Sequence, residues 1–397
     1  MNLLLQAMRF FLEPDADTSL AELSFDPAMR AAIRRNRLAP VLAHVAEKWP
    51  IESESDAWLK TACHAAMAET VARCAALEAV RNTLCDIPWL LLRGPVLGAA
   101  LYGDVFLRPF GDLDVLVAEE HVVDVLRRLD EAGATPPAGA LADAYYRRYH
   151  LHVQRYLPGP ARPVLAEVHW RIDHPYTLFT PDLSGVLARA RPVPIMGIET
   201  SMPGPEDLLL LSALHLLKHA VWLPVWVEQG RVDRLLDAGA LIGLLDIALL
   251  CRSGMDVEIE RAKERAVAWG AAGAVRTCLD AAEAVWPGVV PEATRASFAA
   301  TPPGRIRRLC ERWGGRRPEP DSALSRLQRW RRGGVFRLVR LLDLVEYFCP
   351  PPDFLRRRYG RCGMRDRVVH LNGAVRALVG NGLALRRAQR DAREMKT

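Results

Sequence analysis

Two aspartates separated by one leucine, Asp112 and Asp114, stand directly before an apolar run at residues 115–117. Side chains alternate between the two faces of a β-strand, so both carboxylates point to one face while Leu113 points to the other, towards a core. Two neighbouring carboxylates repel each other unless a cation lies between them. The pattern therefore predicts a half-buried strand whose polar face holds a divalent cation.

A second strand is predicted at residues 164–172, where Glu167 and His169 also share one face. If this strand lies beside the first in a sheet, Glu167 reaches the same cation site. Carboxylate oxygens suit Mg²⁺ or Mn²⁺. Two such ions about 3.5 to 4 Å apart stabilise the attacking and leaving oxygens of a displacement at phosphorus. We therefore predict that the three acids Asp112, Asp114 and Glu167 bind Mg²⁺ or Mn²⁺.

A glycine turn precedes the aspartates in the sequence. The apolar run 88–93 ends at Gly94 and Pro95, which is typical of a buried strand that turns into a helix with proline at its first position. A glycine there would let the backbone approach a triphosphate at the helix N-terminus. An Asp-x-Asp pair alone is weak evidence for metal binding. Here the pair follows a glycine turn and precedes an acid-bearing strand, and this order makes the pattern specific.

The hydrophobic periodicity predicts an α+β chain with four regions. Residues 1–86 read as a helical cap and residues 87–175 as a small mixed-sheet core. Residues 176–313 read as a helical domain that closes the cleft, and residues 314–397 as a basic helical end. Strands are expected at 88–93, 112–117, 149–157 and 164–172, and helices at 119–133, 206–219 and 235–250.

The net charge of +6 is distributed unevenly along the chain. Residues 301–397 hold 24 Arg or Lys against 9 Asp or Glu, which gives +15 and leaves −9 for the rest. Such a region can bind RNA, a polyphosphate or an acidic partner, and a solvated helical surface explains it equally well.

The sequence contains no signal for secretion or membrane insertion. The eight cysteines are scattered without disulfide or zinc spacing, and no apolar run is long enough to cross a membrane. We therefore expect a cytoplasmic protein with reduced thiols that does not associate with membranes. The oligomeric state stays open.

The glycine turn, the Asp-x-Asp pair and the acid-bearing strand resemble those of the DNA polymerase β-type nucleotidyltransferase superfamily, and within it the bacterial "uncharacterised nucleotidyltransferase" family. The resemblance covers roughly residues 30 to 260. The matching positions are Arg93-Gly94, Tyr102, Arg108-Pro109, Gly111-Asp112-Leu113-Asp114, Glu167-Val168-His169-Trp170, His215, Lys218-His219 and Leu244-Leu245-Asp246-Ile247-Ala248.

The resemblance implies a metal-dependent enzyme that transfers NMP from an NTP such as ATP to a hydroxyl-type acceptor and releases pyrophosphate. It implies that Asp112 and Asp114 bind both metal ions, while Glu167 binds the ion that activates the acceptor. The superfamily usually has Gly-Ser or Gly-Gly where this chain has Gly94-Pro95, so phosphate binding is expected to involve arginines. The expected nucleotide-binding residues are Arg93, Gly94, Arg108, Gly111, His169, Lys218 and His219.

Two of the matching residues also admit structural roles. His169 is expected chiefly to orient the metal ligands. Asp246 lies in an apolar helix and needs a buried partner, for which Arg231, Arg234 or Lys218 are candidates.

The acceptor stays open among a small molecule, a peptide or protein, and RNA. Two other functions compete with nucleotidyl transfer. A sugar-nucleotide glycosyltransferase also uses an Asp-x-Asp pair, but it leaves Gly94 and Glu167 without a role. A non-catalytic RNA-binding or scaffold protein on the same fold would use the basic C-terminal region instead.

Overall fold

The computed structural model describes residues 2–14, 22–138, 140, 143, 146–147, 150–160, 162–172, 179–220, 223, 232–252, 255–298 and 363–372. The basic region predicted at 314–397 therefore lies outside the described residues, apart from 363–372. The four-region division and the role of that basic end stay predictions.

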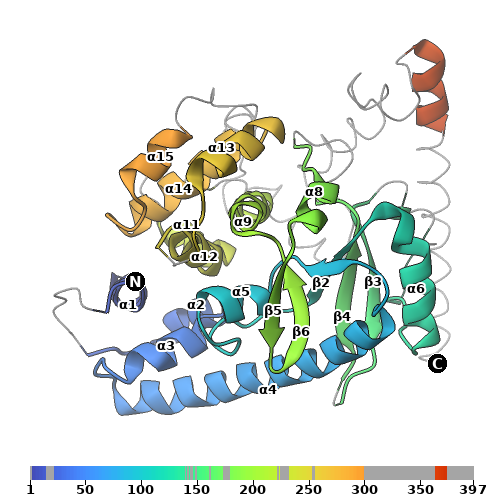
Figure 1. Cartoon of the computed structure of the whole chain (residues 1–397). Coiled ribbons are helices and arrows are strands. Elements are labelled where there is room, and N and C mark those ends of the chain that lie inside the picture. Colours follow the sequence, from blue (N-terminus) through green and yellow to red (C-terminus); the bar gives the residue numbers. More distant parts are fainter. Residues whose placement is uncertain are drawn as a thin grey trace, which may run out of the picture.

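A four-stranded mixed sheet forms the centre of the fold (Figure 1). Its order is β1 (Trp89–Leu91), β2 (Leu113–Val117), β4 (Val164–His169) and β3 (His152–Leu157). The central pair β2 and β4 is parallel, and both outer pairs are antiparallel. All four strands were predicted, and each is shorter than the expected range. The α+β class is confirmed.

The two faces of the sheet belong to different hydrophobic clusters. Leu113 and Val115 of β2 join the cluster under α4 (Ser53–Thr83) and α6 (Val122–Glu131). The alternate residue, Leu116, joins the larger cluster of the helical half. Because side chains alternate along a strand, Asp114 shares the face of Leu116 and points away from α4.

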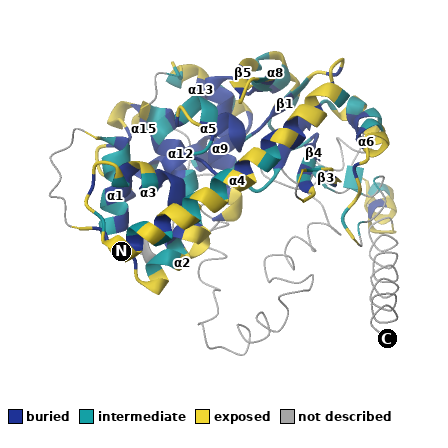
Figure 2. Cartoon of the chain, turned by 90° about the horizontal axis from the view of Figure 1, so that it is seen from below, coloured by how far each residue is buried: buried dark blue, intermediate teal, exposed yellow. Residues whose placement is uncertain are grey.

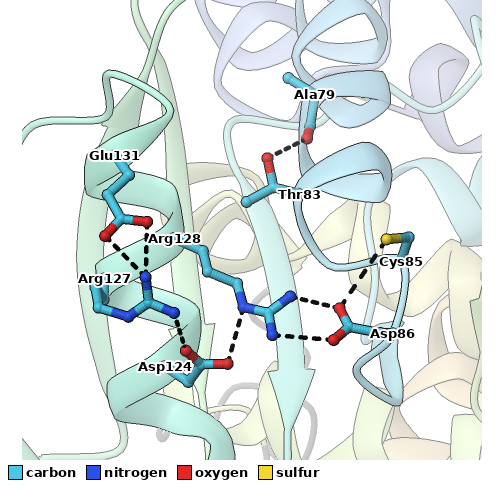
Figure 3. A network of polar contacts seen from close by, with 8 residues as sticks. All are labelled: Ala79, Thr83, Cys85, Asp86, Asp124, Arg127, Arg128 and Glu131. Carbon is cyan, nitrogen blue, oxygen red and sulfur yellow. Dashed lines mark hydrogen bonds and ion pairs between the residues drawn. The ribbon is translucent and has the colours of Figure 1, made fainter.

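The long helix α4 runs along the base of the molecule, and Figure 2 shows, from below, that exposed and buried residues alternate along it. It reaches both clusters. Leu59 near its start packs with the helical half, whereas Leu77 near its end packs under the sheet. At that end Arg128 of α6 donates hydrogen bonds to Asp86 and Asp124 (Figure 3). Asp86 is largely exposed, so this contact orients α6 more than it stabilises the fold.

The helical half surrounds α9 (Pro205–His219), which lies between the sheet and helices α13 to α15 (Figure 1). Nearly every residue of α9 is buried, as expected for a helix that is apolar on all sides. Other helices with residues in its cluster include α1 (Asn2–Leu12), α2 (Pro27–Arg35), α3 (Ala39–Ala46), α11 (Val232–Ala238), α12 (Leu241–Arg252), α13 (Ile259–Ala268) and α14 (Ala272–Val285). The short helix α15 (Glu292–Ser297) packs against α13 and α14. No helix within the described ranges has the length and hydrophobicity to cross a membrane.

The structure corrects the sequence prediction in two places. The helix expected at 235–250 is split into α11 and α12 at Gly239, whose φ of 71° an α-helix does not allow. A hairpin of β5 (Arg191–Ile195) and β6 (Ile198–Met202) was not predicted at all. Prolines at 192 and 194 hid its strand pattern, and its turn at Met196 and Gly197 has positive φ at both positions.

The remaining described elements include α5 (Pro95–Leu101), the 3₁₀ turn η1 (Glu119–His121), α8 (Leu183–Ala188) and a helix at 364–372.

Candidate active site

The register of the sheet brings the predicted acids together. Asp114 of β2 pairs directly with Glu167 of β4, and Gln154 of β3 pairs with Glu167 from the other side. Residues opposite each other in adjacent strands point to the same face. Asp114, Glu167 and Gln154 therefore form one row across the sheet, on the face away from α4.

Asp114 is buried and is held by a guanidinium and an imidazole. Arg93 donates from Nε to Oδ2 at 3.2 Å and approaches Oδ1 with Nη2 at 2.8 Å, and His169 Nε2 lies 2.9 Å from Oδ1. Burial alone would raise the pKa of Asp114, but the charge of Arg93 and the hydrogen bond from His169 lower it well below its usual value. Arg93 also contacts His215 of α9, so it connects the sheet to that helix.

Glu167 is held by uncharged and weakly basic groups. Gln154 donates to its Oε1 at 2.7 Å, while His169 Nε2 and His152 Nδ1 lie 3.4 and 3.5 Å from its Oε2. Burial would raise the pKa of Glu167, but the close imidazoles of His169 and His152 and the amide of Gln154 lower it to about 2. Burial beside His169 lowers the pKa of His152 to about 4.

Asp112 immediately precedes β2 and differs from the other two acids. Within the described part of the chain, no hydrogen bond or ion pair reaches its half-buried carboxylate. Burial and the charges of Asp114 and Glu167 raise its pKa to about 6. An unpaired carboxylate beside two others is unfavourable, and a divalent cation would relieve the repulsion. The oxygen donors of the three acids therefore fit Mg²⁺ or Mn²⁺.

The glycine turn has the geometry that the sequence predicts. Gly94 has a φ of 67° and leads into α5, with Pro95 in the first turn of that helix. A Cβ at Gly94 would lie 3.2 Å from the Phe110 side chain, two residues before Asp112. The turn thus lies beside the aspartates because a glycine permits both the backbone angle and the close approach.

Arg37 is a site residue that the sequence did not reveal. Its φ is 57°, and its Nη2 lies 2.9 Å from where a Cβ on Gly111 would be. Arg37 is exposed as a residue, yet crowding around its guanidinium lowers its pKa despite the nearby charge of Asp112. The sequence offers no signal for it beyond one arginine between two helices, because the contact spans more than 70 positions of the chain.

Arg108, predicted to bind phosphate, is engaged elsewhere. Its Nε and Nη2 donate to the two oxygens of Asp246 at 2.8 and 2.6 Å, and Tyr102 donates to the same carboxylate at 2.8 Å. The pair is buried, and the charge of Asp246 outweighs burial and raises the pKa of Arg108. Asp246 does have the predicted buried partner, but Arg108 and Tyr102 take the place of the expected candidates Arg234 and Lys218. The third candidate, Arg231, lies outside the described residues.

The last turn of α9 faces the acids. His215 and His219 lie with ring centroids 4.4 Å apart, and burial together with the charges of Lys218 and Arg93 lowers the pKa of His219. Lys218 and the carboxylate of Glu167 lie close enough to influence these imidazoles. This helix face therefore lies beside the acids, and its contact with a nucleotide stays a prediction.

Comparison with known proteins gives one match. A family model described as "Uncharacterised nucleotidyltransferase" covers residues 26–287, which include Arg37, the three acids and the whole of α9. No curated protein and no solved structure matches the chain.

Proposed function

Because the chain belongs to the uncharacterised nucleotidyltransferase family, we propose that it transfers a nucleoside monophosphate from an NTP to a hydroxyl-type acceptor. The acceptor oxygen would bond to the α-phosphorus, the bond to the β-phosphate oxygen would break, and pyrophosphate would leave. The observation that carries the proposal is the row of acids, in which Asp114 and Glu167 are register partners and Asp112 is unpaired.

Asp112, Asp114 and Glu167 are the residues that we assign to hold Mg²⁺ or Mn²⁺. When bound, such ions neutralise the phosphate charge and stabilise the oxygens that attack and leave. Glu167 would hold the ion on the acceptor side, as the resemblance to the superfamily implies. The protein itself would contribute mainly by positioning the reactants and by its fixed charges.

Arg37 and Arg93 are our candidates for binding the triphosphate. The guanidinium of Arg37 is close to Asp112 and forms no hydrogen bond with the residues that the structure describes. Arg93 is shared with Asp114 and His215, and a guanidinium has further donors for phosphate oxygens. Lys218 and His219 would approach from α9. Arg108 has a structural role in this proposal, because its Nε and Nη2 already donate to Asp246.

The test uses each α-labelled NTP with Mg²⁺ or Mn²⁺ and a lysate separated into RNA, protein and small molecules. We expect label in one fraction, and no label with Asp112→Asn or Asp114→Asn. Glu120→Gln, an exposed acid three residues past β2, is the matched control and should transfer normally. Undiminished transfer by both aspartate variants would contradict the proposal.

Two further measurements separate the competing functions. Hydrolysis of a sugar nucleotide without pyrophosphate release from any NTP would indicate a glycosyltransferase. Salt-sensitive RNA binding that survives loss of all three acids, with no label transferred, would indicate an RNA-binding protein.

A further inference from the structure

Two imidazoles flank Glu167 on the side away from Asp112. His169 lies on the same strand as Glu167, and His152 on β3 is the register partner of His169. One ligand atom from each of His152, Glu167 and His169 lies within 4.8 Å of the others. The acids of the proposed reaction do not explain why two histidines are placed here.

Two of the three separations between these atoms suit ligands around one ion. The Oε2 atom of Glu167 lies 3.5 Å from His152 Nδ1 and 3.4 Å from His169 Nε2. Ligands about 2.1 Å from a tetrahedral ion lie about 3.4 Å from each other. Both measured separations are longer than a good hydrogen bond and match this ligand spacing.

Among the described residues, His152 Nδ1 has no hydrogen-bond partner. It is buried and makes no hydrogen bond with any described residue. Leaving a buried polar atom unsatisfied is costly, so such an atom calls for a ligand. A histidine that served only the core would turn this nitrogen to a backbone group or to water.

His169 is oriented for the same task. Its Nδ1 lies 3.3 Å from the carbonyl oxygen of Arg171, an acceptor that would hold the proton on Nδ1 when the lone pair of Nε2 binds an ion. Binding would replace its present contact with Asp114, whose carboxylate keeps the two contacts from Arg93.

We infer that His152, Glu167 and His169 form a mixed nitrogen and oxygen site that selects a transition-metal ion over Mg²⁺. Imidazole suits first-row transition metals, whereas Mg²⁺ prefers oxygen ligands. The inference rests on the proposed function only in taking Glu167 as a metal ligand.

The test measures metal binding without nucleotide, with Co²⁺ as the probe, because Mn²⁺ also suits the oxygen ligands of the three acids. In the wild-type protein, pulsed electron paramagnetic resonance should detect ¹⁴N coupling from coordinated imidazole. His152→Gln should reduce that coupling and weaken Co²⁺ binding about tenfold or more, with Mg²⁺ binding changed less than about twofold. His64→Gln, an exposed histidine on α4, is the matched control and should behave as the wild type.

Either of two results would overturn the inference: no ¹⁴N coupling in the wild-type protein, or the same coupling and affinity in His152→Gln. The wild-type spectrum decides the question even if the variant folds poorly. Nitrogen coupling without any nucleotidyl transfer would leave this site standing while the proposed function fails. Nucleotidyl transfer without nitrogen coupling would support the proposed function and rule out this metal site.

Discussion

Replacing Asp112 with asparagine is expected to stabilise the metal-free protein at neutral pH. The folded state raises the pKa of this carboxyl from 3.8 to about 6, so the folded chain binds the proton more tightly than the unfolded chain does. Stability from this group therefore falls as the pH rises from about 4 to 6, and the penalty is complete above that range. At about 1.4 kcal/mol per pH unit, the penalty is about 3 kcal/mol at pH 7.5.

The measurement is urea unfolding followed by tryptophan fluorescence in the presence of a chelator. At pH 7.5 the Asp112→Asn variant should exceed the wild type by up to about 3 kcal/mol, and at pH 5 by about half as much. Addition of Mn²⁺ at about 100 times its dissociation constant should add about 2.7 kcal/mol to the wild type and much less to the variant. The difference in free energy of unfolding between the variant and the wild type should thus become smaller or change sign when metal is present.

Glu120→Gln removes an exposed carboxylate close by in sequence and serves as the control, with little change expected at either pH. The reasoning fails if Asp112→Asn destabilises the metal-free protein at pH 7.5. It also fails if the gain is the same at pH 4 as at pH 7.5, because the gain would then not come from the titration of Asp112.

Three further predictions concern the arginines. Arg108→Ala leaves the carboxylate of Asp246 buried and unpaired, so the free energy of unfolding should fall by about 3 to 5 kcal/mol in a denaturant titration; a loss of activity with unchanged stability would instead support a phosphate role. Arg37→Ala should raise the KM for the NTP severalfold in initial-rate assays, whereas Arg34→Ala on α2 should not. Gly111→Ala should displace the Arg37 guanidinium and raise the KM in the same way, and because that group is flexible, the thermal midpoint should hardly change.

The local features of the site were predictable from the sequence. Strand alternation put Asp112 and Asp114 on one face, and the Gly94-Pro95 pair marked a strand that turns into a helix. Both features depend on residues close together in the chain, and the structure contains the strand and the turn. Their metal and nucleotide roles stay predictions.

The parts that were missed depend on distant contacts. Arg37 approaches Gly111, Arg108 finds Asp246, and His152 finds Glu167 only once the sheet and the helices have packed. Periodicity carries no information on such pairs. The β5–β6 hairpin was missed for a different reason, because its prolines conceal the alternation by which a strand is recognised.

The 31-residue helix α4, about 46 Å long, packs against both hydrophobic clusters. Neither cluster can lose its packing without exposing part of that helix, so their unfolding should be coupled into one cooperative transition. Amide hydrogens in the middle of α4 should then exchange with solvent only through that global opening. The site between the sheet and the helices would therefore stay intact until the whole molecule unfolds.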